Sequence, residues 1–243
     1  MPILISHTSS LERLRSIPPQ VDRAVLVEDP LPLAPFAQSG GPYSEQQLRK
    51  LGLMQRPVHC LVPQKRHASP GEAVRVHRCQ RTELPAGLVR RIDENAYCAG
   101  PELTFIQMAD RLTPIGTVVL GHELCGTYAH FSQMISGFYE RPALTSVKLL
   151  YEAIGQLRGM HGLGAARKAL GWIRDGSASP METVIAAMLV LPTKLGGFGL
   201  VAPELNYEVE LDLSEARIAG VKLPRIDTAY PSVHVGVEFD GKW

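Results

Sequence analysis

The sequence predicts an α/β protein whose N-terminal part is α+β. Strand candidates occur at 58–62 and 73–79, segments with helical periodicity follow, and strand-like runs return near 206–212, 222–229 and 233–239. With 243 residues, 45% of them hydrophobic and 20% charged, the chain can form one large or two small domains. We expect a basic N-terminal α+β region (1–98), a helical middle region (99–176) and a C-terminal α/β region (177–243).

The N-terminal region should begin with a short helix within residues 1–16, where Ser9 and Glu12 have the spacing of a capping box. Residues 18–42 are rich in proline, which leaves little regular structure beyond a strand at 24–27. A helix at 44–50, ended by Gly52, then precedes the strands at 58–62 and 73–79.

In the middle region, Pro101 predicts the start of an amphipathic helix. Its apolar positions are Leu103, Phe105, Ile106, Ala109 and Leu112. Glu102 and Asp110 are then interpreted as solvated helix charges. A helix at 146–157 is followed by glycines at 159, 162 and 164, which suit a helix–helix turn because no strand precedes them as a dinucleotide-binding loop requires.

Charge is distributed unevenly although the net charge is only +1. Residues 49–91 carry ten Lys or Arg against two acidic residues, whereas residues 204–243 carry eight acidic residues against four basic ones. This asymmetry predicts a DNA-binding surface that includes Arg90 and Arg91. Arg167 and Lys168 lie on the approach to the C-terminal region and are further candidates for contacts with phosphates, with a solvated helix face as the alternative. The alternative is solvated faces and attraction between the two halves of the chain.

The four cysteines, at positions 60, 79, 98 and 125, are widely spaced and predict reduced, buried thiols. His59-Cys60 and His77-x-Cys79 could meet around zinc, but their spacing fits no closed zinc module. No apolar run approaches the length of a membrane span, and the first residues lack the basic region and apolar core of a signal peptide. We therefore expect a cytoplasmic protein that does not bind membranes.

Four carboxylates stand out in the C-terminal region: Glu182, Asp227, Glu238 and Asp240. Strand side chains repeat with a period of two, so Glu238 and Asp240 should share a face. Carboxylates at neighbouring strand ends supply the oxygen ligands that Mg²⁺ prefers. Each also has a local explanation, since Ser179-x-x-Glu182 is a capping box, Asp227 can end a strand, and Asp240-Gly241 is a common turn dipeptide.

Four segments around these carboxylates occur in a characteristic order. They are Ser179-Pro180-Met181-Glu182, Gly196-Gly197-Phe198-Gly199-Leu200 leading to Pro203-Glu204-Leu205-Asn206-Tyr207, Arg225-Ile226-Asp227 through Tyr230-Pro231, and Val237-Glu238-Phe239-Asp240-Gly241. Together they resemble the endonuclease-like domain related to very-short-patch repair nucleases, a branch of the PD-(D/E)xK superfamily. The resemblance implies a restriction-endonuclease-like sheet with flanking helices and Mg²⁺-dependent hydrolysis of phosphodiester bonds in DNA. It also implies that Asp227 and Glu238 bind the metal and that Glu182 and Asp240 complete the catalytic set.

Two departures from this pattern shape the expectation. Asp240 stands where the superfamily has its lysine, and relatives continue beyond the position of Trp243 with a histidine, a helix carrying a basic residue and a further strand. We therefore expect an incomplete sheet with weak or no cleavage. Val233, Val235, Val237 and Phe239 alternate with polar residues or glycine, so this face should be buried against the helix at 163–174 or a partner molecule. If the edge strand stays uncovered, self-association is expected.

A second resemblance covers residues 74–128. The segments Val-Arg-Val-His-Arg (74–78), Leu-Pro-Ala-Gly-Leu-Val-Arg-Arg-Ile (84–92) and Gly-Pro-Glu-Leu-Thr-Phe-Ile-Gln-Met-Ala (100–109) are similar to the region that precedes this nuclease domain in actinobacterial proteins. They are also similar to the middle of type IV abortive-infection antitoxins, which are transcriptional regulators. Gln107 takes the place of an aspartate in the antitoxin pattern. The alternative function is therefore a non-catalytic, antitoxin-like regulator that binds DNA or a protein partner.

Overall fold

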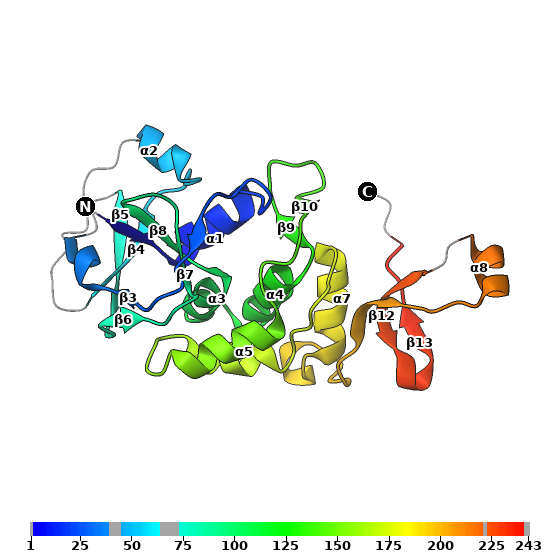
Figure 1. The fold of residues 1–243 in the computed structure, drawn as a ribbon. Helices are drawn as coiled ribbons and strands as arrows, with labels where there is room; N and C mark the ends of the chain where they lie inside the picture. Colours follow the sequence, from blue (N-terminus) through cyan, green and yellow to red (C-terminus); the bar gives the residue numbers. More distant parts are fainter. Residues whose placement is uncertain (1, 39–44, 64–72, 221–222, 241–243) are drawn as a thin grey trace. The chain divides into compact units, whose positions relative to one another are not determined.

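The chain folds into a mixed α/β protein with two compact units, seen in a computed structural model that describes residues 2–38, 45–63, 73–220 and 223–240 (Figure 1). Unit 1 comprises residues 1–117 and 148–170, and unit 2 comprises residues 118–147 and 171–243. This division differs from the three consecutive regions expected from the sequence, because the helices of the middle region are shared between the two units. The α/β class itself is confirmed.

Within the described residues, unit 1 is built on a six-stranded mixed sheet of order β2-β7-β8-β1-β4-β5. Its strands are β1 (Ile3–Ile5), β2 (Val25–Leu26), β4 (Val58–Pro63), β5 (Val74–Cys79), β7 (Val89–Arg91) and β8 (Ala96–Ala99). The pairs β1–β8 and β4–β5 are parallel, and the other pairs are antiparallel. The short helix expected within residues 1–16 is confirmed as α1 (His7–Ser16), but β1 before it was missed. Ile3, Leu4 and Ile5 are fully buried in this inner strand.

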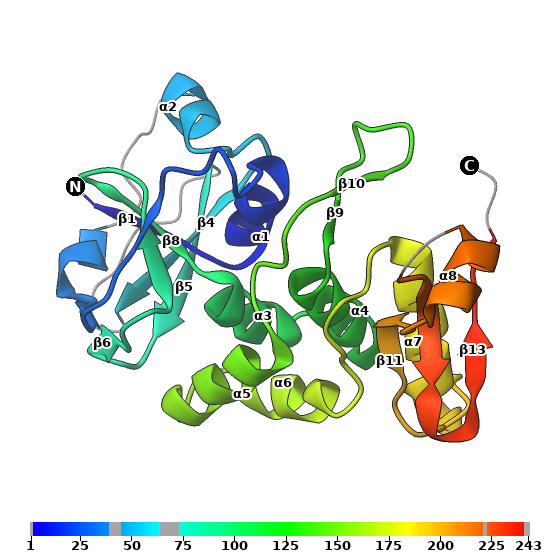
Figure 2. The same cartoon turned by 45° about the vertical axis from the view of Figure 1, so that its right-hand side comes forward.

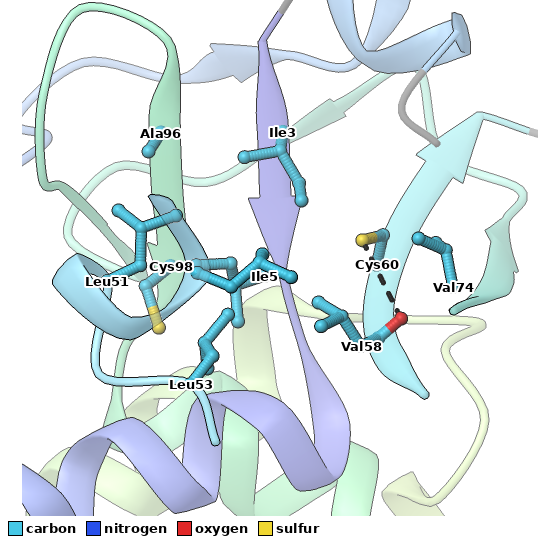
Figure 3. Packing of buried hydrophobic residues seen from close by; sticks show 10 residues of the cluster. Ile3, Ile5, Leu51, Leu53, Val58, Cys60, Val74, Ala96 and Cys98 are labelled. Atoms are coloured by element: carbon cyan, nitrogen blue, oxygen red, sulfur yellow. Dashed lines mark hydrogen bonds between the residues drawn. The ribbon is translucent and has the colours of Figure 1, made fainter. Parts of the chain in front are cut away.

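One face of this sheet carries a compact hydrophobic core (Figure 3). The core joins alternate residues of β1, β4 and β8 with leucines from α2 (Glu45–Lys50) and the segment after it: Ile3, Ile5, Val58, Cys60, Ala96, Cys98, Leu48, Leu51 and Leu53. On the opposite face, Leu4 lies beside Tyr97, whose ring meets Phe36 edge-on with centroids 5.3 Å apart. Phe36 belongs to the 3-10 helix η1 (Ala34–Gln38). The short strand β3 (Leu31–Pro32), just before η1 in the sequence, pairs with β6 (Glu83–Leu84).

The remaining helices of unit 1 are α1 (His7–Ser16), α3 (Pro101–Ala109), α5 (Val147–Gln156) and α6 (Leu163–Leu170). The N-cap of α1 is Ser6 and not Ser9, and Glu12 accepts hydrogen bonds from the backbone N–H groups of Met54 and Gln55 at 2.7 and 2.8 Å. The predicted capping box of α1 is therefore wrong, because Glu12 makes tertiary contacts instead.

Helix α3 begins at Pro101 as predicted, but it is not amphipathic, because all nine of its residues are buried. It packs against α1, α6 and β8. Glu102 is thus buried, contrary to the expectation of a solvated charge, whereas Asp110 is exposed as expected. The glycine turn between α5 and α6 is confirmed, since Gly162 has φ +87° and a side chain there would clash with the carbonyl oxygen of Ile106.

Unit 2 combines a helix–hairpin part with a small antiparallel sheet. Helix α4 (Pro114–Cys125) enters it and is followed by β9 (Tyr128–His130) and β10 (Phe138–Glu140). Helix α7 (Pro180–Val190) and the 3-10 helix η2 (Thr193–Leu195) lead into the sheet β11-β12-β13. In Figure 2 this sheet lies beside α7, which contacts β12. Its strands are β11 (Glu204–Glu208), β12 (Arg225–Tyr230) and β13 (Val235–Val237), with the 3-10 helix η3 (Pro231–Val233) before β13.

The three strands and the N-cap of α7 at Ser179 agree with the sequence analysis, but helix α8 (Leu213–Ala219) was missed. Asp212 caps it and Glu215 closes a full capping box, so the Asp-x-x-Glu spacing was the overlooked signal. The expected burial fails for Val233 of η3 and Val235 of β13, which are 64% and 50% exposed.

Two further sequence predictions concern the whole chain. All four cysteines are buried and form no disulfide, and burial raises the pKa of Cys60 and Cys98 to about 12. None of the helices in the described part of the chain is long and apolar enough to cross a membrane.

Candidate functional site

Two predicted site residues, Asp227 and Glu238, face each other across the β12–β13 pair. Thr228 lies opposite Val237 and Ala229 opposite Gly236. Continued by one residue past the end of β13, this antiparallel register places Asp227 opposite Glu238. Directly opposed residues in such a pair extend on one face of the sheet. The Asp227 carboxylate is held in place by the backbone N–H of Phe239, which donates to Oδ2 at 2.9 Å. The register therefore makes the two residues neighbours, and their joint binding of one metal ion stays a prediction.

The electrostatics of Glu238 reflect this proximity. Desolvation, the nearby Asp227 carboxylate and, more weakly, Asp240 together raise the pKa of Glu238 above its ordinary value. Like charges placed directly opposite on a sheet destabilise it by about 0.2–1 kcal/mol. A proton shared by the two carboxylates, or a cation bound between them, relieves this repulsion.

Glu182 occupies the first turn of α7 and is only 8% exposed. The Ser179 hydroxyl accepts the Glu182 N–H at 3.2 Å, so the N-cap predicted from the sequence is present. The Glu182 carboxylate does not close the capping box onto Ser179; its Oε2 instead accepts hydrogen bonds from the Ala178 N–H at 2.9 Å and from Asn206 Nδ2 at 2.8 Å. Local capping therefore explains the backbone of Glu182 but not the whole of its carboxylate environment.

Asn206 connects Glu182 to the row of carboxylates. Its neighbours Leu205 and Tyr207 pair with Thr228 and Ile226, so Asn206 lies opposite Asp227 on β11. Asn206 has a left-handed backbone with φ +49°, and its Nδ2 also donates to the carbonyl of Gly176 at 2.8 Å. Left-handed non-glycine residues are uncommon and concentrate at sites where tertiary contacts fix them. Sequence reasoning assigned no role to Asn206, although it lies within the matched Pro-Glu-Leu-Asn-Tyr segment.

The arrangement is a row of Asn206, Asp227 and Glu238, with Glu182 attached through Asn206. Asp240 is exposed, and its negative charge contributes to the raised pKa of Glu238. In the part of the chain that the structure describes, no three His, Cys, Asp or Glu side chains are grouped closely enough to hold a metal ion by themselves. Oxygen-only donors on two facing carboxylates nevertheless suit Mg²⁺, which commonly binds one or two protein carboxylates and completes its shell with water and substrate phosphate.

The predicted basic surface is divided in the structure. Arg90 and Arg91 lie on β7, whereas Arg75 and Arg78 lie on β5, four strand spacings or about 19 Å away across the sheet. Arg91 is exposed and Arg90 half-buried. Arg167 and Lys168 are exposed in the last turn of α6, as expected of a solvated helix face. Lys65 and Arg66, which belong to the same charge count, lie outside the described residues.

The two histidines that the sequence analysis considered for zinc do meet. His77 Nε2 lies 2.8 Å from His59 Nδ1. The neighbouring Cys60 belongs to the hydrophobic core on the other face of the sheet, so the two His-Cys pairs do not form one zinc module.

Comparison of the chain with known protein families, with curated proteins and with solved structures finds no match.

Proposed function

We propose that unit 2 is a restriction-endonuclease-like domain of the PD-(D/E)xK type that hydrolyses phosphodiester bonds in DNA with Mg²⁺. The observation that carries the proposal is the opposition of Asp227 and Glu238 across β12 and β13. Two like charges in this position oppose the pairing of the strands, and a divalent cation turns this repulsion into attraction. The order of sequence segments around the two residues supports the same assignment.

In this proposal Asp227 and Glu238 hold the metal, and the hydrogen bond from the Phe239 N–H fixes the Asp227 carboxylate. Asn206 orients Glu182, which stands at the end of the row and positions a water molecule. A bound Mg²⁺ supplies the lowered pKa of an attacking water and neutralises charge on the phosphate in the transition state. Asp240 replaces the lysine of the superfamily and adds negative charge, so we expect slow hydrolysis.

DNA binding in this proposal uses basic residues of unit 1, namely the half-buried Arg90 and the exposed Arg91, Arg167 and Lys168. Contacts of Lys and Arg with phosphates provide affinity without sequence specificity and weaken as salt rises. Self-association through β13 is the second proposed contact, because this edge strand leaves Val235 exposed.

The test is nicking of supercoiled plasmid by the full chain with Mg²⁺ or Mn²⁺, compared with EDTA. We expect slow nicking that requires the metal and falls at least about a hundredfold in Asp227→Asn and Glu238→Gln, since each variant removes a metal-binding charge. The matched control is Glu208→Gln, which neutralises another acid of the same sheet, one that pairs with Arg225 at 2.6 Å. Metal-independent DNA binding without any nicking would favour the antitoxin-like regulator instead.

A further inference from the structure

Unit 1 contains a cluster of three histidines contributed by different elements. His7 begins α1, His59 lies on β4 and His77 on β5. The rings of His7 and His77 stack with centroids 3.5 Å apart and an interplanar angle of 16°. His77 is joined in turn to His59 by the 2.8 Å contact between ring nitrogens. These three residues are called the histidine cluster below.

The backbone at His7 is held in an unusual conformation. Its φ of +53° is left-handed, which costs a non-glycine residue about 1–3 kcal/mol. Several hydrogen bonds maintain it: the His7 N–H donates to Gln107 Oε1 at 2.9 Å, the Ser10 hydroxyl donates to the His7 carbonyl at 2.8 Å, and Nδ1 lies 3.0 Å from the Ser6 hydroxyl. Such fixed strain is characteristic of sites where a side chain must be presented to a ligand.

The cluster adjoins a pocket of about 300 Å³, at the lower end of the range for small-molecule sites. His7 and His77 line it together with Gln107, Asp110, Arg78 and Arg81. Gln107 is only 3% exposed, and its Nε2 has no hydrogen-bond partner among the residues that the structure describes. A buried amide N–H left without an acceptor is unfavourable by about 1–3 kcal/mol, so a ligand that accepts a hydrogen bond from Gln107 Nε2 would be favoured here.

The charges around the cluster favour an anion over a metal cation. Arg78 and Arg81 line the pocket against the single carboxylate of Asp110. Burial, the neighbouring His77 and His59, and the charge of Arg111 together lower the pKa of His7 to about 2. Burial, His59, Arg111 and Arg75 together lower the pKa of His77 to about 4. The pKa of His59 is lowered by burial, Arg111 and Arg75. The imidazoles are therefore neutral at pH 7 in a positive field, where each ring can donate one N–H.

We propose that this pocket binds a phosphoryl group in the form of a phosphomonoester. A tetrahedral dianion presents enough oxygens to accept hydrogen bonds from Gln107, an imidazole and a guanidinium together, whereas a planar carboxylate has only two oxygens. The start of α1 at His7 adds the positive end of a helix dipole. The proposal is independent of the metal-dependent function assigned to unit 2.

Binding of such an anion should be linked to protons. A bound dianion stabilises the imidazolium form, so binding raises the pKa of the clustered histidines and takes up protons below neutral pH. The other titratable or charged groups that line the pocket or act on the cluster are Arg75, Arg78, Arg81, Asp110, Arg111 and His161. Of these, Asp110 is negative and opposes binding, whereas the arginines favour it.

The experiment follows the imidazole nitrogens of the full chain by ¹H–¹⁵N NMR while inorganic phosphate is added at pH 7. We expect saturable shifts in His7, His59 and His77 and none in His234 of unit 2. Gln107→Glu keeps an oxygen to accept the His7 N–H but removes the free donor and adds negative charge, so affinity should fall at least about tenfold. Arg111→Ala should weaken binding several-fold, whereas Arg23→Ala, an exposed arginine outside the pocket lining, should leave it unchanged.

Two further arms identify the source of the phosphoryl group. A nucleoside monophosphate that binds more tightly than phosphate points to a small molecule, and preference for a 5′-phosphorylated over an unphosphorylated oligonucleotide points to the end of a nucleic-acid strand. The proposal is overturned if phosphate leaves the three imidazoles unmoved, or if a correctly folded Gln107→Glu variant binds as wild type does. Zn²⁺ shifting the three imidazoles where phosphate does not would also overturn it in favour of a metal centre.

Discussion

Replacing Asp227 by Asn should make unit 2 more stable without metal and less responsive to metal. The asparagine keeps an oxygen that can accept the Phe239 N–H, now 2.9 Å from Asp227, so no backbone hydrogen bond is lost. What disappears is the repulsion with Glu238, which Coulomb's law puts at about 1 kcal/mol for charges about 4 Å apart in water and which salt reduces. We therefore expect a gain of about 0.2–1 kcal/mol in the free energy of unfolding in EDTA at low ionic strength.

Magnesium should reverse this order. A ligand present at about a hundred times its dissociation constant stabilises the folded state by about 2.7 kcal/mol, and only the wild type retains both carboxylates. Urea unfolding monitored through unit 2, with EDTA and then with saturating Mg²⁺, measures both effects. Glu208→Gln is the control, because it removes a surface ion pair with Arg225 worth about 0–1 kcal/mol and should leave the metal response intact. An Asp227→Asn variant less stable than wild type in EDTA, or equally stabilised by Mg²⁺, would refute the reasoning.

Four further predictions follow from the fold. The pKa values of the histidine cluster are lowered in the folded state, so the contribution of these residues to stability is complete above about pH 6.5 and is lost as the pH falls. The loss is up to about 1.4 kcal/mol per pH unit for each histidine, and urea unfolding at a series of pH values measures it. Gly162→Ala should destabilise unit 1 by more than about 1 kcal/mol in thermal unfolding, because φ is +87° and the new methyl meets the Ile106 carbonyl. Replacing Arg90 and Arg91 together by Ala should flatten the salt dependence of DNA binding by up to about one phosphate contact per residue, and an unchanged slope would count against a role in binding. Val235→Lys should reduce self-association in sedimentation velocity, because lysine on an edge strand discourages pairing.

The sequence predicted elements well where one local signal dominated. Helix α7 starts at the predicted Ser179 cap, and β4 and β5 coincide within one residue with the strands predicted at 58–62 and 73–79. Local signals failed where burial on all sides removed the alternation of apolar and polar residues. Helix α3 is buried on every face, and β1 has only three residues, too few to show an alternation. In α8 the local signal was present, since Asp212 and Glu215 form the capping box, but the segment between the predicted strands at 206–212 and 222–229 was given no structure.

The candidate site could be predicted only in part for a related reason. The period of two places Glu238 and Asp240 on one face, but the opposition of Asp227 and Glu238 depends on strand register, which the residues alone leave open. The bond from Asn206 to Glu182 requires α7 to lie beside the sheet, and the histidine cluster joins residues up to 70 positions apart, as the contact of His7 with His77 shows. Such convergence is a property of the tertiary fold and leaves no short motif.

The most direct test of the proposed metal site is anomalous X-ray scattering from crystals of the full chain grown with Mn²⁺ in place of Mg²⁺. The account predicts an anomalous peak within about 2.0–2.6 Å of carboxylate oxygens from both Asp227 and Glu238. The peak should disappear in crystals of Asp227→Asn. Ordered Asp227 and Glu238 side chains with no anomalous density between them, at a Mn²⁺ concentration that supports plasmid nicking, would contradict the account.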